Sequence, residues 1–236
     1  QNPNQVVNFV NNRFIEHLLN QGCLLGHASG IALAGHGLAL AGFAGAGKST
    51  LALHAMSLGA DLVSNDRVLV RPGRPPRFFG VAKHPRINPG TALNNPDLAG
   101  VLSDADRARF TALPPKELWN LEHKYDAIVE ECFGPGRFRL AAPMNGLMIL
   151  HWTHGGGPAR IRPFDPRKRH DLLAAFMKAT GSFYLPAPGL PQDQPVERYA
   201  ETLAECACIE VDGGVDFDAA ARACLDLLKT GALPHA

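Results

Sequence analysis

The residues best suited to chemistry lie in segment 38–50, which reads LALAGFAGAGKST. An apolar run stops at Gly42, and Gly47, Lys48 and Ser49 complete the pattern G-x-x-x-x-G-K-[ST] of a phosphate-binding P-loop. Glycines let backbone N–H groups turn toward phosphate oxygens, and the N-terminus of the following helix adds a positive field. A plain glycine-rich turn would need neither the lysine nor the hydroxyl. The segment therefore predicts a nucleotide-binding loop.

Each polar group of this loop has an expected role. Lys48 is expected to reach the β- and γ-phosphates, and the Ser49 hydroxyl is expected to ligate Mg²⁺. ATP and Mg²⁺ are accordingly the expected cofactors. The expected nucleotide-binding residues are Gly42, Ala44, Gly45, Ala46, Gly47, Lys48, Ser49 and Thr50.

A magnesium ion held by one serine also needs a carboxylate. Asp66 lies seventeen residues beyond Ser49, at the end of the strand expected after the loop's helix. Asp61 is the rival, but it begins that strand and is expected to point away from the loop. Asp66 is therefore the predicted metal ligand or base, with a plain turn-forming role as the alternative.

The elements that must position these residues follow from hydrophobic spacing and from Gly and Pro signals. Residues 71–113, rich in Pro, Gly, Asn and Arg, are expected to form loops and short strands that carry substrate contacts. The expected elements are helices in 5–20, 48–58, 166–178 and 217–229, a strand–turn–strand unit of 31–34, 35–37 and 38–41, and strands in 61–64, 67–70, 146–152 and 207–211.

These elements predict a single α/β domain over residues 1–236. Its expected parts are an N-terminal helix in 1–22, a core in 23–165 with the P-loop at 42–50, and C-terminal helices with the last strand in 166–236.

Composition excludes several classes of partner. The net charge is +1 and the basic residues are scattered, so no nucleic-acid footprint is indicated. Gly, His or charged residues interrupt the apolar stretches, so no membrane span is expected. Five cysteines without a CxxC pair predict structural thiols in a reducing, cytoplasmic compartment. No secretion signal is recognisable, and because the sequence opens with Gln1 rather than Met, a longer N-terminus stays open.

The stretch GFAGAGKST, followed by GADLVSNDRVLV, resembles the HPr kinase/phosphorylase family and its relatives. In that family a strand after the GKS loop and its helix ends in two aspartates and then Arg-Val, where this chain has NDRV at 65–68. The family's His-Gly pair, fifteen residues before the first loop glycine, is matched by His27 and Ala28. Segment 131–134, ECFG, resembles a later turn of the family. The resemblance covers residues 23–85 well and 120–150 weakly.

The resemblance implies a fold and an activity. The implied fold is the HPr kinase type, shared by the ATP-dependent phosphoenolpyruvate carboxykinases, with a mixed sheet flanked by helices. The implied activity is transfer of the γ-phosphoryl group of ATP to a hydroxyl of a protein serine or of a small molecule. Asp66, Lys48, His27 and Asn65 are the implied catalytic residues, with Ser49 and Asp66 on the metal. A homo-oligomer is one expected assembly, while a carboxykinase would need a substrate domain that the chain is too short to contain.

Two departures from the family pattern keep a second function open. Asn65 replaces the first aspartate and can position an acceptor but cannot take its proton, and Thr50 replaces a glutamate. Phosphoryl transfer depends mainly on positioning and charge neutralisation, so these changes are compatible with a kinase. The alternative is an ATP-binding regulatory module without phosphotransfer. The complete set of Lys48, Ser49 and Asp66 favours the kinase.

The other histidines and the basic residues outside the loop have more than one candidate role. His27 is assigned either to the γ-phosphate or metal region or to ordinary hydrogen bonding, and His36 is expected to be merely exposed at a turn. His151 and His154 have no third metal ligand at a telling spacing. A further cation is expected to neutralise the transition state. The candidates are Lys83, Arg86, Lys116, Lys124, Arg137 and Arg139.

Overall fold

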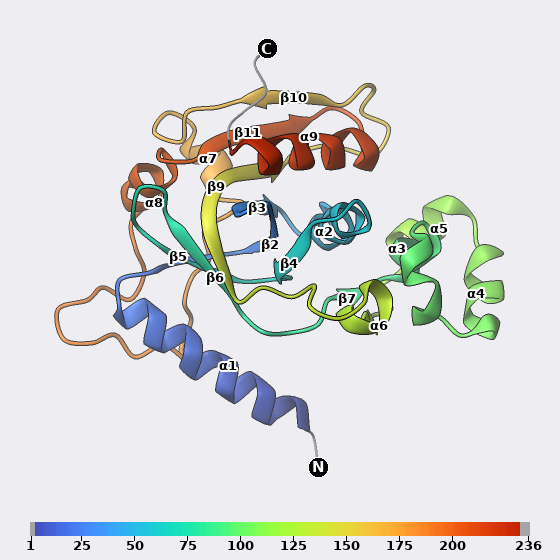
Figure 1. Cartoon of the computed structure of the whole chain (residues 1–236), viewed down its shortest axis with the longest axis horizontal. Helices are drawn as coiled ribbons and strands as arrows, with labels where there is room; N and C mark the ends of the chain where they lie inside the picture. The colour runs from blue at the N-terminus through green and yellow to red at the C-terminus, as the bar shows by residue number, and fades with distance from the viewer. Residues whose placement is uncertain (1–2, 232–236) are drawn as a thin grey trace.

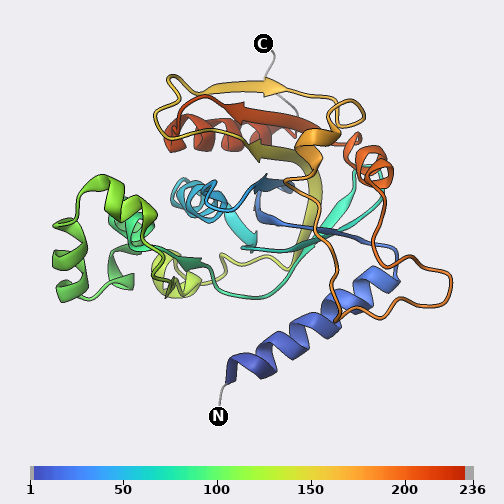
Figure 2. The same cartoon turned by 180° about the vertical axis from the view of Figure 1, so that it is seen from behind.

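The computed structural model describes residues 3–231, which form a mixed α/β structure (Figures 1 and 2). The strands are β1 (Leu24–Gly26), β2 (Ala28–Leu33), β3 (His36–Gly42), β4 (Asp61–Ser64), β5 (Val68–Arg71), β6 (Arg77–Gly80), β7 (Arg86–Ile87), β8 (Tyr125–Asp126), β9 (Ala141–Leu150), β10 (Arg160–Pro163) and β11 (Ala207–Asp212). The helices are α1 (Pro3–Asn20), α2 (Lys48–Ser57), α3 (Pro89–Leu93), η1 (Pro96–Val101), α4 (Asp104–Thr111), α5 (Pro115–Asn120), α6 (Val129–Phe133), α7 (His170–Leu173), α8 (Val196–Leu203) and α9 (Phe217–Thr230).

One mixed sheet of nine strands organises the fold. Its order is β1-β5-β6-β9-β3-β2-β4, and β11 and β10 extend from β9. The pairs β3·β9 and β9·β11 are parallel, whereas β2 is antiparallel to both β3 and β4. The mixed sheet flanked by helices agrees with the fold class expected from the sequence.

Helices cover both faces of this sheet. On one face α2 and α9 pack against Leu38 and Leu40 of β3, and on the other α7 and α8 belong to the cluster that includes Ala39 and Ala41. Strands buried on both faces are apolar at consecutive positions rather than at alternate ones. This is why the run before the loop reads LALA.

The hairpin of β2 and β3 aligns the start of one strand with the end of the other. Its turn is Ala34-Gly35, with φ values of 52° and 86°, the left-handed pair that a two-residue hairpin turn requires. Ala28 pairs with Ala41, so the chain position of His27 falls opposite Gly42. The expected strand–turn–strand unit is confirmed, with the turn one residue earlier than expected.

Two parts of the chain extend from the sheet (Figure 1). The long helix α1 contacts the body through its C-terminal half, where Ile15, Leu18 and Leu19 are buried and Arg13 and Asn20 form hydrogen bonds, and its N-terminal half projects away. Helices α3, α4 and α5 form a lobe at the side of the molecule where α2 lies, and Figure 2 shows the same lobe from behind.

The sequence-based elements are wrong in two segments. Residues 166–178 are helical only in α7, because Phe176 is buried and the next residues leave the helix to pair with β1, where Met177 bridges Gly26. Residues 71–113, expected as loops and short strands, also contain α3, η1 and α4. The side chains of Asn95 and Ser103 cap η1 and α4. Ala92, Leu98 and Phe110 join the apolar cluster that includes α2, so capping and packing together stabilise these helices.

Candidate active site

The segment from Gly42 to Thr50, here called the glycine loop, connects β3 to α2 in the strand–loop–helix order that the motif needs. Gly45 and Gly47 have φ values of 79° and 84°, a left-handed conformation that favours glycine. A Cβ on Gly47 would lie 2.7 Å from Phe217, whereas a Cβ on Gly45 would meet nothing within 4 Å. The glycines thus permit a tight turn with open space above Gly45, where a phosphate would fit.

Lys48 lies across the start of the glycine loop. Its Nζ donates hydrogen bonds to the carbonyl oxygens of Gly42, at 2.7 Å, and Phe43, at 3.3 Å. Burial lowers the pKa of Lys48, and the negative charge of Asp66 acts against that effect. The two side chains are therefore electrostatically coupled across the loop.

Asp66 lies in the turn between β4 and β5, and this turn is fastened to the start of β2. The N–H of Ala28 donates to the Asp66 carbonyl at 3.2 Å, and the Ser29 hydroxyl donates to the Asn65 carbonyl at 2.6 Å. The β2–β3 register has already brought this part of β2 beside Gly42. Three neighbouring strands thus bring the β4–β5 turn to the beginning of the glycine loop.

The carboxylate of Asp66 has two partners. His27 Nε2 lies 3.5 Å from its Oδ1, and Arg67 Nε lies 3.5 Å from its Oδ2. The hydrogen bond with His27 lowers the pKa of Asp66, burial opposes this, and the charges of Arg67 and Lys48 lower it further. The side chain is still 61% exposed. Asp66 is therefore an ionised, accessible carboxylate, as a metal ligand must be.

Asn65 and Thr50 contribute differently. The Oδ1 atom of Asn65 is buried without a hydrogen-bond partner, while its backbone carbonyl binds Ser29. The Thr50 hydroxyl lies 2.8 Å from the hydroxyl of Thr91 and so joins the glycine loop's helix to α3. Of the predicted catalytic set, Lys48, Asp66 and His27 come together, and Asn65 joins them through its backbone.

A pocket of about 1400 Å³ opens beside the glycine loop. Its walls come from α2, the α3–α5 lobe, the segment 154–157 and the start of α9. Lys48, Ser49 and Thr50 line it, but Asp66 and His27 do not. The glycine loop therefore separates a large pocket on one side from the Asp66–His27 pair on the other.

The coupling between Asp66 and Lys48 predicts a pH effect. Asp66 raises the pKa of Lys48, so Asp66→Asn is expected to lower that pKa further. A neutral lysine attracts phosphate less. As the pH is raised in metal-free buffer, the variant should therefore lose its affinity for inorganic tripolyphosphate at a lower pH than the wild type does. Calorimetric titrations between about pH 7 and 10 would measure this. If the pH at which this affinity is lost is the same in the variant as in the wild type, or is higher, the coupling between Asp66 and Lys48 is contradicted.

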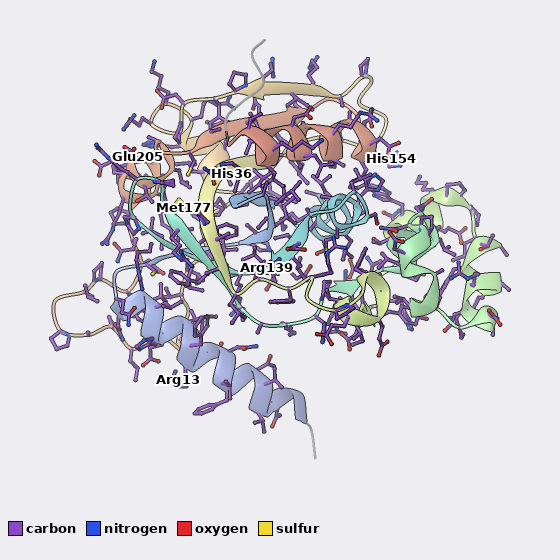
Figure 3. The ribbon with its side chains drawn as sticks, viewed as in Figure 1. Arg13, His36, Arg139, His154, Met177 and Glu205 are labelled. Atoms are coloured by element: carbon purple, nitrogen blue, oxygen red, sulfur yellow. The ribbon has the colours of Figure 1, made fainter. Side chains whose placement is uncertain are left out.

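The candidate transition-state cations separate into groups. Arg137 and Arg139 both bind Asp61 at the start of β4, with N–O distances of 2.9 and 2.7 Å. Arg137 also donates to the carbonyls of Met56 and Ala60, so this pair fastens the end of α2 to the sheet. Figure 3 labels Arg139. Arg86 and Lys124 line the pocket, whereas Lys83 and Lys116 are exposed outside it.

Among the other histidines and the cysteines of residues 3–231, His54 and His154 line the pocket. The expectation for His36 is wrong, because its Nδ1 contacts the Leu228 carbonyl at 2.9 Å, near the end of α9. Within residues 3–231, no group of three or more His, Cys, Asp or Glu could hold a metal ion by itself. Burial raises the pKa of the Cys206 thiol to about 12, which suits a structural thiol.

Sequence analysis missed Arg67, Thr91 and Trp119 as site residues. Arg67 was visible as a charge beside Asp66. Thr91 and Trp119 lie in the stretch after residue 71, where no spacing relates them to the glycine loop. Only the packing of the α3–α5 lobe against α2 brings them to the pocket.

Comparison with models of protein families finds no match. Comparison with curated proteins likewise finds none. Among solved structures, the fold is similar to that of the Hpr(Ser) kinase/phosphatase from Coxiella burnetii, with a TM-score of 0.41 and 10% sequence identity over 87% of each chain. At this level of similarity, only the chain's own residues can support a function. No helix in residues 3–231 is both long and apolar enough to span a membrane.

Proposed function

We propose that this protein is a Mg²⁺-dependent kinase that transfers the γ-phosphoryl group of ATP to a hydroxyl of a protein serine or a small molecule. The observation that carries the proposal is the convergence of Lys48, Asp66 and His27 at the beginning of the glycine loop. A phosphate-binding loop alone would need only the first of these groups. On this proposal, the other two supply a carboxylate and its histidine partner beside the terminal phosphate of the nucleotide.

The chain's own groups supply the expected elements of phosphoryl transfer. Backbone N–H groups of the glycine loop and the N-terminus of α2 bind phosphate oxygens, and Lys48 neutralises their charge. Ser49 and Asp66 would hold Mg²⁺, which would neutralise the negative charge that develops on the phosphates during transfer. His27 orients the Asp66 carboxylate through their contact.

The lowered pKa of Asp66 bears on its role. A carboxylate with a low pKa is a weak base, but it stays charged over a wide pH range. Since the transition state of phosphoryl transfer is loose, positioning the acceptor and neutralising charge can account for most of the rate. We therefore assign Asp66 to metal binding and acceptor positioning, with Asn65 on the acceptor side.

An ATP-binding regulatory module remains the second candidate. The feature in its favour is Asn65, whose side chain cannot accept a proton from a hydroxyl and whose Oδ1 is buried without a partner. Such a module would bind nucleotide through the glycine loop and transfer nothing.

The substitution Asp66→Asn tests the kinase directly. It keeps the size of the side chain but removes the charge, so it is expected to lower transfer about a hundredfold. The measurement is transfer of label from γ-labelled ATP with Mg²⁺ in an extract of the source organism. Recovery of the label in acid-insoluble or in acid-soluble material separates a protein acceptor from a small molecule.

A matched control comes from Asp171, a surface carboxylate that is 63% exposed and is also paired with an arginine, Arg169, at 2.8 Å; neither residue lines the pocket. Asp171→Asn should leave transfer unchanged. If wild-type protein binds ATP but produces no label that depends on Asp66, the kinase is wrong and the regulatory module stands. ATP binding is checked separately by calorimetry.

A further inference from the structure

We propose that the pocket beside the glycine loop is a nucleoside site in which the base of the bound nucleotide stacks on Trp119. This inference rests on the proposed function, since it assumes that the glycine loop binds the phosphates. It goes beyond that function by assigning the other end of the nucleotide to named residues of the α3–α5 lobe and the segment 154–157.

The two sides of the glycine loop set the direction of the nucleotide. Asp66 and His27, which suit the terminal phosphate and its metal, lie outside the pocket. Lys48, Ser49 and Thr50 line the pocket, and Thr50, two residues beyond Lys48, is the one that contacts the α3–α5 lobe. In a P-loop the backbone amides cradle the α- and β-phosphates while the lysine reaches toward the γ-phosphate. The nucleoside, attached to the α-phosphate, must therefore leave the loop on the pocket side.

The pocket wall begins at this point. Thr50 contacts Thr91 of α3 through their hydroxyls, so α3 starts within a side chain's length of the glycine loop. The lining continues along the lobe through Asn94 and Leu118 to Trp119. On the opposite side it runs from Phe217 to His154 and the three glycines that follow.

Trp119 is the exposed aromatic side chain of this wall. Its residue is 45% exposed, and α5 has no buried residue, so the indole does not serve the core. The ring centroids of Trp119 and His154 are 4.7 Å apart with an interplanar angle of 75°. Figure 3 labels His154 between the start of α9 and the α3–α5 lobe. An edge-to-face contact leaves at least one face of the indole uncovered.

The other aromatic groups of the pocket are already engaged. Phe217 packs under Gly47 and against Trp152, with ring centroids 5.0 Å apart. His54 Nε2 lies 2.9 Å from an Asp218 carboxylate oxygen. Trp152, which does not line the pocket, donates its Nε1–H to the Ala46 carbonyl at 2.9 Å and so stabilises the glycine loop. Among the described lining residues, Trp119 is therefore the one that offers a free, flat apolar face to a base.

The test compares ATP with inorganic tripolyphosphate, which has the phosphates but no nucleoside. Stacking of one base on an aromatic side chain contributes about 1–3 kcal/mol. Trp119→Ala is therefore expected to raise the Kd for Mg-ATP about tenfold and to change the Kd for tripolyphosphate less than twofold. Trp119→Phe, which keeps a flat ring, should retain most of the ATP affinity. Isothermal titration calorimetry on the full chain measures all three.

Tryptophan fluorescence gives an independent readout. ATP should change the emission of Trp119 while tripolyphosphate does not, and Trp119→Phe should abolish the difference. Phe9→Ala is the matched control, since Phe9 is an exposed aromatic on α1, far along the chain from the pocket.

Two results would overturn the stacking of the base on Trp119 without affecting the proposed kinase function. One is an unchanged ATP affinity in Trp119→Ala, and the other is an equal loss of affinity for ATP and tripolyphosphate. If the wild-type protein binds neither ligand, the proposed function fails and the nucleoside site fails with it.

Discussion

Lys48→Met is expected to lower phosphoryl transfer about a thousandfold, the largest effect on activity of any single substitution in this site. The lysine supplies the positive charge at the start of the glycine loop, and Arg67, the cation beside Asp66, is paired with that carboxylate. Without Lys48, the side-chain charge that offsets the repulsion between the bound phosphates and the carbonyl oxygens of Gly42 and Phe43 would be lost. The measurement is label transfer from γ-labelled ATP together with the Kd for Mg-ATP.

The same substitution should not unfold the protein. Burial already penalises the charged form of Lys48, as its lowered pKa shows, so methionine of similar length removes a desolvation cost. The midpoint of thermal unfolding is expected to stay within a few degrees of wild type. Lys168→Met, which removes a highly exposed lysine elsewhere, is the matched control and should transfer normally. A Lys48→Met protein that keeps a tenth of the wild-type rate would contradict the role of this residue.

Gly80→Ala is expected to lower the free energy of unfolding by about 3 kcal/mol, the largest effect on stability that we predict. Gly80 ends β6, and β4 passes directly over it. A Cβ on Gly80 would overlap the carbonyl oxygen of Val63, and backbone atoms cannot rotate aside as a side chain can. The strand β4 would have to move, and with it the turn that carries Asp66. Urea denaturation followed by circular dichroism measures the change.

A matched glycine is available for this prediction. Gly100 lies in η1, and a Cβ there would meet nothing within 4 Å. Gly100→Ala should therefore leave the free energy of unfolding within about 0.5 kcal/mol of wild type. Activity gives a second readout, because a displaced β4 would separate Asp66 from His27. If Gly80→Ala is as stable as Gly100→Ala, the close approach of β4 to β6 is wrong.

Much of the geometry of the glycine loop can be predicted from the sequence because its determinants are local. The spacing from Gly42 to Ser49 specifies a loop and a helix start through backbone conformation alone. The fifteen residues between His27 and Gly42 also have a local cause. A two-residue turn at Ala34-Gly35 pairs positions whose numbers sum to 69, so it sets 27 opposite 42.

The meeting of Asp66 with His27 depends on more than local spacing. It requires β4 to pair with β2 rather than with β3, and a bulge between Gly30 and Ile31 adjusts that register. Neither feature has a signal in the sequence. Sequence analysis placed Asp66 correctly at a strand end, but its partners Arg67 and His27 follow from the pairing.

For Arg137 and Arg139, the sequence predicts that the two side chains share a face but not which residue they contact. Their alternation predicts one shared face, which is correct, since both reach Asp61. The partner of that face is Asp61, and the position of Asp61 depends on where β4 begins. The two candidate catalytic cations therefore bind β4 instead of a phosphate. Residues 166–178 differ from expectation for a similar reason, because pairing with β1 replaces the last turns of a helix.

The sequence by itself determined the glycine loop, its lysine and serine, the strand and helix around it, and the carboxylate at the next strand end. These depend on backbone conformation and hydrophobic spacing within short segments. Only the tertiary structure decided which residues face the loop from afar: the His27–Asp66 contact, the α3–α5 lobe, and the meeting of Trp119 with His154. Such contacts join segments tens of residues apart, and the packing of buried side chains sets them, which no local pattern encodes.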